Sequence, residues 1–259
     1  MFSSPSGDLL IPICPNCLIK GIAFYSHPHG TSKSEGYFCP SCKKYLQGPS
    51  IRFQESDIYV GDVRDFLRDY KGQKFDLILI DPPWKYQIDL IPKSRKTENH
   101  YDTMTIDEIA SLPILNIATK PSILFLWATN SLLPEAIHVM REWGFRFVSK
   151  IEWVKKNDGK LQKGMGYNLM GSSESILIGK HGAYPVPDFR PPSVIEAPRT
   201  RHSEKPELSY LTIERMYPRA RKLEIFARKP RKGWFVVGNQ INVHSFGKKT
   251  REVCIKGGN

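Results

Sequence analysis

A short aliphatic run that ends in two prolines constrains the fold of this chain more than any other stretch. Residues 77–80 read Leu-Ile-Leu-Ile, and Asp81-Pro82-Pro83-Trp84 follows directly. An unbroken apolar run of this length predicts a strand buried on both faces of a parallel sheet. Proline lacks a backbone N–H and has a fixed φ, so the strand must stop before Pro82. We therefore expect Asp81 at the carboxyl end of a central strand, where open α/β sheets bind their ligands.

The turn after this strand carries groups that suit a flat base with an exocyclic amine. The Asp81 carboxylate and the Pro82 carbonyl can accept hydrogen bonds from the amine, and no neighbouring N–H is obliged to claim the two proline carbonyls. Trp84 can stack on the base. The alternative is a strand-ending turn with a core tryptophan, because turn chemistry alone favours Asp and Pro.

Apolar patterns in the rest of the chain predict an α/β fold around this strand. The other strands are expected over residues 57–60, 122–130, 147–154, 174–179, 222–228 and 233–240, and the helices over residues 63–70, 132–143 and 206–217. Asp62 is the expected N-cap of the first helix. The polar segment 85–104 follows the Asp-Pro-Pro-Trp turn without a clear period, which is typical of a functional loop.

Two Cys-x-x-Cys pairs mark the N-terminal part of the chain. Each pair can offer two thiolates to a tetrahedral ion, and together they close a four-sulfur zinc site. A segment of this size has too little core to fold unaided. A redox dithiol is the less favoured alternative, because the pairs match and no thioredoxin-like pattern surrounds them. We therefore predict a zinc-ribbon-like module over residues 1–50, with structural zinc bound by Cys14, Cys17, Cys39 and Cys42.

The composition indicates a globular protein with a polyanionic partner. The formal net charge is +12, which favours nucleic acid. No apolar run approaches the ~20 residues that span a bilayer, and the first residues do not form a secretory signal. We expect an intracellular protein from a reducing compartment, because the paired cysteines suit a metal better than disulfides.

Taken in order, the motifs resemble the MT-A70 family of adenine amino-methyltransferases, which use S-adenosylmethionine (SAM). The resemblance runs from about residue 57 to 240 and rests on Asp81-Pro-Pro-Trp84, Tyr101-Asp-Thr-Met104, Gly164-Met-Gly-Tyr167, Lys205-Pro206 and Asn239-Gln240. It implies a Rossmann-like methyltransferase sheet with helices on both faces over residues 51–245. A basic tail, 246–259, follows.

The resemblance also assigns roles to individual residues. It makes the catalytic set Asp81, Pro82, Pro83 and Trp84. The SAM-binding set is Asp62, Val63, Asp81, Lys205, Glu224, Phe226, Arg228, Asn239 and Gln240. The substrate-binding set is Trp84, Tyr101, Trp127, Lys155, Tyr167 and Arg199. From the residues alone, Trp127 is more often a core side chain and Lys205 an exposed one. The chain departs from the family at 229–231, where Lys-Pro-Arg replaces a His-Asn pair, which puts a ribose contact there in doubt.

The sequence therefore predicts an enzyme that transfers a methyl group from SAM to the 6-amino nitrogen of adenine in nucleic acid. Its compact size and Gly-x-Gly-Tyr loop favour DNA over RNA. An RNA adenosine methyltransferase and an inactive nucleic-acid-binding subunit are the alternatives. Cytosine amino-methylation is disfavoured by Asp81, since enzymes of that kind usually have Ser there. A protein partner or a homo-oligomer stays open.

Overall fold

A computed structural model describes residues 22–26, 34–38, 45–46, 57–85, 103–164, 169–187, 189–199, 204–241 and 251–252. The chain divides into two compact units. The first comprises residues 1–53, 187–191 and 200–218, and the second comprises residues 54–186, 192–199 and 219–259. Among the described residues, no helix has the length and apolar character needed to cross a membrane.

Among its described residues, the first unit contains a small antiparallel sheet and one helix. The sheet order is β1 (Ile22–Ser26), β2 (Ser34–Phe38) and β3 (Tyr45–Leu46). All three strands lie within residues 1–50, the range of the predicted zinc-ribbon-like module. The four cysteines lie outside the described residues, so the zinc site stays a prediction. Helix α4 (Glu207–Met216) begins after Pro206, close to the predicted start.

The second unit is built on a large mixed sheet. In the part of the chain that is described, its strands follow the order β10-β7-β9-β6-β5-β11-β12-β4-β13, and β8 pairs with β7. The strands are β4 (Asp57–Val60), β5 (Phe75–Ile80), β6 (Ala118–Ala128), β7 (Arg146–Asn157), β8 (Lys160–Leu161), β9 (Ser173–His181), β10 (Val194–Ala197), β11 (Lys222–Ile225), β12 (Trp234–Gly238) and β13 (Arg251–Glu252).

Strand β5 occupies the centre of this sheet, as its sequence predicted. It pairs in parallel with β6 on one side and with β11 on the other. Strands β12 and β4 continue the parallel part beyond β11. Strand β9 is antiparallel to both β6 and β7, so β7 runs in the same direction as β6. The carboxyl ends of β4, β5, β6, β7, β11 and β12 therefore lie at the same edge of the sheet.

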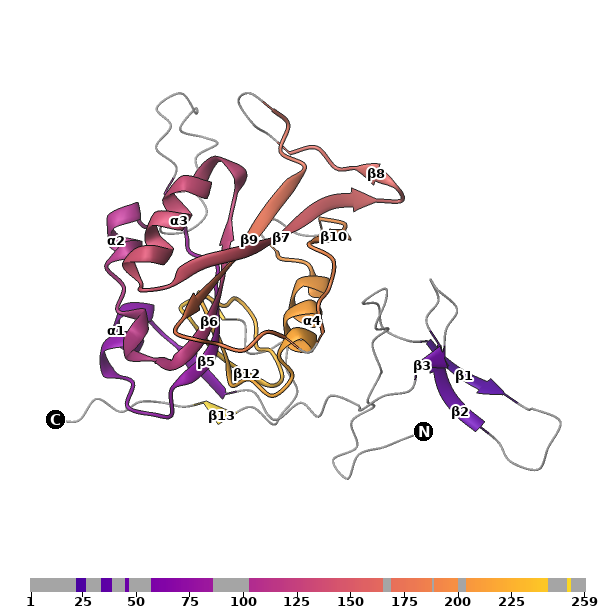
Figure 1. The fold of residues 1–259 in the computed structure, drawn as a ribbon, viewed down its shortest axis with the longest axis horizontal. Coiled ribbons are helices and arrows are strands. Elements are labelled where there is room, and N and C mark those ends of the chain that lie inside the picture. Colours follow the sequence, from indigo (N-terminus) through magenta and orange to yellow (C-terminus); the bar gives the residue numbers. More distant parts are fainter. Residues whose placement is uncertain are drawn as a thin grey trace. The chain divides into compact units, whose positions relative to one another are not determined.

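Three helices of the second unit pack on one face of the sheet (Figure 1). They are α1 (Val63–Asp69), α2 (Ile106–Ala110) and α3 (Leu133–Glu142), with the 3-10 turns η3 (Ile114–Asn116) and η4 (Asn130–Leu132) beside them. Their apolar side chains share one buried cluster with Ile78 and Ile80 of β5. Leu77 and Leu79, which point to the opposite face, are at most 1% exposed. The prediction that β5 is buried on both faces is confirmed.

Local sequence signals set the ends of these helices. Asp62 caps α1, and Thr105 with Glu108 forms a capping box at the start of α2. Gly144 follows α3 with a φ of +75°, as expected for a glycine that ends a helix. Strand β11 is shorter than predicted, because Phe226 has a φ of +64° and turns the chain out of the sheet.

Candidate active site

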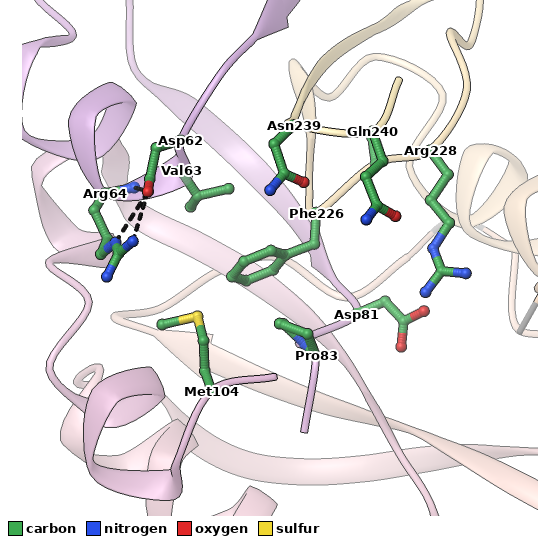
Figure 2. A pocket seen from close by; sticks show the side chains of 11 residues that line it. Asp62, Val63, Arg64, Asp81, Pro83, Met104, Phe226, Arg228, Asn239 and Gln240 are labelled. Atoms are coloured by element: carbon green, nitrogen blue, oxygen red, sulfur yellow. Dashed lines mark hydrogen bonds and ion pairs between the residues drawn. The ribbon is translucent and has the colours of Figure 1, made fainter. Parts of the chain in front are cut away.

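A pocket opens at the carboxyl edge of the parallel strands in the second unit (Figure 2). Five chain segments line it: four of them follow a strand, and the fifth, Met104, precedes α2. The lining residues are Asp62, Val63 and Arg64 after β4; Asp81 and Pro83 after β5; Met104 before α2; Phe226, Ala227 and Arg228 after β11; and Asn239 and Gln240 after β12. This is the edge at which open α/β sheets bind ligands.

Asp62 and Arg64 form a paired group at one side of the pocket. The backbone N–H of Arg64 donates to Asp62 Oδ1 at 2.7 Å, which is the predicted helix cap. The Arg64 side chain also binds both carboxylate oxygens, with Nε at 3.1 Å from Oδ1 and Nη2 at 2.6 Å from Oδ2 (Figure 2). These side-chain hydrogen bonds hold the pKa of Asp62 below its ordinary value, although partial burial opposes the shift. Asp62 therefore stays ionised and oriented.

The turn after β5 is held by backbone hydrogen bonds. The Pro82 carbonyl accepts from the N–H of Trp84 at 2.9 Å, and the Pro83 carbonyl accepts from the N–H of Met104 at 2.8 Å. The expectation that both proline carbonyls are unclaimed is wrong. The turn brings the N–H of Trp84 to the Pro82 carbonyl, and Met104, which pairs with Trp84, lies close enough to reach the Pro83 carbonyl. A carbonyl oxygen has two lone pairs, so Pro82 still has one for a ligand amine.

The Trp84 side chain lies in the core rather than in the pocket lining. It is 5% exposed and belongs to the cluster beneath α2 and α3. Its indole N–H donates to the carbonyl of Trp127 at 3.1 Å. Trp84 is therefore a core side chain next to a strand-ending turn, which is the alternative interpretation of the Asp-Pro-Pro-Trp motif. Stacking of Trp84 on a base stays a prediction.

The turn after β11 brings an aromatic ring into the pocket. Phe226 adopts the left-handed conformation, which is rare for a bulky side chain, and its ring lies among the pocket residues in Figure 2. The N–H of Ala227 then donates to the carbonyl of Val237 at 2.9 Å. This bond brings the turn so close to β12 that a Cβ on Gly238 would lie 2.2 Å from the Ala227 carbonyl oxygen. Glycine is required at 238 for this contact.

The remaining predicted SAM-binding residues lie in different places. Glu224 is buried within β11, between Leu223 and Ile225 of the helix-side cluster, so it points to the other face of the sheet and does not line the pocket. Lys205 belongs to the first unit. Their roles stay predictions.

The other predicted substrate residues that are described lie on β6, on β7 and just after β10. Trp127 is 1% exposed and packs edge-on against Trp153. Lys155 Nζ is 2.6 Å from Glu174 Oε1, in a largely buried ion pair. Arg199 is exposed, and its backbone N–H donates to Gln162 Oε1 at 2.6 Å. Tyr101 and Tyr167 lie outside the described residues.

Three lining residues were not identified from the sequence: Arg64, Met104 and Ala227. Arg64 had an available signal, because a cation two positions after a capping Asp can reach its carboxylate. Met104 belongs to the Tyr101-Asp-Thr-Met104 motif, but that motif does not assign it to the pocket. Ala227 had no signal, since its place depends on the left-handed turn at Phe226.

The pocket combines carboxylates and amides with an apolar surface. Asp62, Asn239 and Gln240 can bind hydroxyl and amine groups, and Phe226 and Val63 can pack on a flat ring. This set of groups fits an adenosine-containing ligand such as SAM. Asp81 lines the same pocket from the end of β5 and offers a hydrogen-bond acceptor to a second ligand.

Comparison with known proteins gives one family match and several curated relatives. A family model described as MT-A70 matches residues 75–240. An "N(6)-adenosine-methyltransferase MT-A70-like" protein of Arabidopsis thaliana is 35% identical over 70% of this chain and 26% of its own length. The "N(6)-adenine-specific methyltransferase METTL4" of Homo sapiens is 28% identical over 77% of this chain and 43% of its own length. The "Type II methyltransferase M.MunI" of a Mycoplasma species is 27% identical over 65% of this chain and 78% of its own length.

The chain thus spans about a quarter of the length of its plant relatives. The matched region begins at the first residue of β5 and ends at Gln240, the last pocket residue after β12.

Proposed function

The chain belongs to the MT-A70 family, and on this premise we propose that it transfers a methyl group from SAM to the 6-amino nitrogen of adenine in nucleic acid. The observation that supports this most strongly is the position of Asp81. Its carboxylate lies at the end of β5, in the same pocket as the residues that suit adenosine. DNA is the favoured substrate on the ground of the Gly164-Met-Gly-Tyr167 loop, as in the sequence-based prediction.

In this proposal, Asp62, Val63, Phe226, Arg228, Asn239 and Gln240 hold SAM. Bound SAM supplies an electrophilic methyl group on a sulfonium. Lys205 and Glu224 are retained as proposed contacts from the family resemblance. Arg64 keeps Asp62 ionised, and so prepares an acceptor for a hydroxyl or amine of the ligand.

The turn residues act on the target amine. The lone pair of the 6-amino nitrogen of adenine is delocalised into the ring, so the nitrogen is a poor nucleophile. Asp81 and the free lone pair of the Pro82 carbonyl each accept one amine hydrogen, which favours a pyramidal nitrogen with a localised lone pair. Positioning then supplies most of the rate. The nitrogen becomes acidic when it is methylated, so it does not have to lose a proton before it attacks the methyl group.

Trp84 is proposed to anchor this turn. Its buried ring and its bond to the Trp127 carbonyl fix the end of β5 against the core. This position favours an anchoring role over the stacking role predicted from the sequence.

The test is methyl transfer from labelled SAM to matched duplex DNA, single-stranded DNA and RNA, followed by identification of the modified nucleoside. We expect Asp81→Asn to reduce transfer by about 10²-fold or more, the size of losing one preorganised electrostatic group. Asp107→Asn, an exposed carboxylate on α2, is the matched control. Full activity of Asp81→Asn would rule out this mechanism. Methylation of RNA adenosine alone would make the protein an RNA enzyme, and SAM binding without transfer would indicate a missing partner.

The zinc site is proposed from the sequence alone. Elemental analysis of the purified full-length chain should give one zinc per chain, and Cys14→Ser with Cys17→Ser should remove it. Retention of full zinc by that variant would exclude the four-cysteine site.

A further inference from the structure

A basic and apolar arm extends from the sheet edge that carries the pocket. We define the β7–β8 arm as residues 155–164 and 169–172. Strand β7 runs parallel to β6, so its carboxyl end reaches the same edge as Asp81. Figure 1 shows β7 and β8 projecting as a hairpin, away from α1, α2 and α3.

The arm is well supported by backbone hydrogen bonds. Strand β8 pairs with the end of β7, and the two strands are joined by Asp158-Gly159 with φ values of 47° and 79°, as in a tight hairpin turn. Gln162 N–H donates to the Lys155 carbonyl at 2.7 Å, and Lys155 N–H donates to the Ser172 carbonyl at 2.8 Å. The arm therefore presents its side chains from a regular backbone.

The arm carries more positive charge than the neighbouring strands neutralise. Its segment contains four lysines and one aspartate. Lys155 is paired with Glu174, and Lys156 with Glu196, at 2.6 and 2.9 Å. Lys160 and Lys163 are exposed. Arg199, also exposed, is tied to the arm through its backbone bond to Gln162.

The arm also exposes large apolar side chains that contribute little to the core. Leu161 is 57% exposed, Leu169 is 84% exposed and Met170 is 61% exposed. Large apolar side chains exposed within one short segment make it a candidate interaction site. Of these three residues, Leu161 lies within a strand of the hairpin, where it is paired with Lys156.

We propose that the β7–β8 arm binds nucleic acid beside the target adenine. Lys160 and Lys163 meet phosphates, and Leu161 packs into the base stack next to the extruded base. The inference rests on the proposed function, since an adenine within a duplex must leave the stack to reach Asp81. Apolar side chains inserted between bases offset such unstacking in other nucleic-acid-binding proteins. The charge of the arm favours a polyanion over a protein partner.

The lysines are tested by duplex binding at several salt concentrations, measured by fluorescence anisotropy. Lys160→Gln with Lys163→Gln should weaken binding about tenfold and reduce the salt slope by about 1.8, the value for two lost phosphate contacts. The double variant Lys71→Gln with Lys74→Gln, two exposed lysines that precede β5, is the matched control and should bind as the wild type does. SAM affinity, measured by calorimetry, should be the same in all of them.

The role of Leu161 is tested by comparing methyl transfer to a paired adenine with transfer to an unpaired one. Leu161→Ala should lower transfer to a paired adenine about tenfold and leave transfer to an adenine opposite an abasic site unchanged, because that base needs little energy to unstack. Leu115→Ala, at an exposed leucine of η3, should change neither rate.

Three outcomes would overturn this inference, and the first two leave the proposed function standing. If the wild type methylates nucleic acid and the arm variants bind and methylate equally well, only the arm inference is overturned. If Leu161→Ala changes the oligomeric state in sedimentation but not nucleic-acid binding, the arm is a protein interface, which also overturns it. If the wild type binds SAM but neither DNA nor RNA, the proposed function fails and the arm inference fails with it.

Discussion

Gly238→Ala tests whether the close contact between β12 and the Phe226 turn shapes the pocket. A Cβ at this position would lie 2.2 Å from the Ala227 carbonyl oxygen and 3.1 Å from its nitrogen. The neighbour is backbone and cannot rotate away. Opening the contact from 2.2 Å to at least 3.0 Å displaces one of the two backbones by about 0.8 Å, because a packed interior has no space to absorb the methyl group.

The expected effect is both structural and functional. Overpacking of this kind costs about 1–3 kcal/mol in the free energy of unfolding. The displaced segment carries three lining residues, Phe226, Ala227 and Arg228. We expect SAM affinity to fall about tenfold, which corresponds to about 1.4 kcal/mol. Methyl transfer should fall about 10²-fold, as is typical of misplacement on the 1 Å scale.

Two other glycines provide controls for urea denaturation and SAM calorimetry. At Gly179 an added Cβ would meet the flexible Met140 side chain at 2.7 Å, so Gly179→Ala should destabilise the protein less than Gly238→Ala does. Gly159 has a φ of +79° and nothing within 4 Å of an added Cβ, so Gly159→Ala tests backbone strain alone, at about 1 kcal/mol. Wild-type SAM affinity in Gly238→Ala would refute the reasoning.

Three further substitutions test local features. Phe226→Gly should be about 1 kcal/mol more stable in urea than Phe226→Ala, because only glycine adopts the left-handed conformation without strain; the reverse order would contradict a strained turn. Because Arg64 lowers the folded-state pKa of Asp62 below 3.8, the wild type should be more stable than Asp62→Asn above about pH 4 and lose this advantage as the pH falls through the lowered pKa. A difference in urea midpoint that does not change with pH would argue against that ion pair. Thr105→Ala should cost about 1 kcal/mol through loss of the capping box, and Thr105→Ser should restore it; equal stabilities would show that the box contributes nothing.

The sequence by itself determined the elements whose signals are local. The run before Asp81 predicts a buried strand, and two prolines fix its end, so the carboxylate at the sheet edge follows from neighbours in the chain. The caps at Asp62 and Thr105, and the glycine after α3, depend in the same way on residues within a turn of one another. The order of the motifs was sufficient to identify the family.

Only the tertiary structure decided which of these residues share the pocket. Glu224 and Phe226 are two positions apart, yet only Phe226 lines the pocket, because Glu224 is still within β11 and Phe226 has left the sheet. The placement of Trp84 depends on Trp127, and the need for glycine at 238 depends on Ala227. Such contacts join residues on different strands. No pattern within either strand records them, because they arise only when the sheet brings the two strands together.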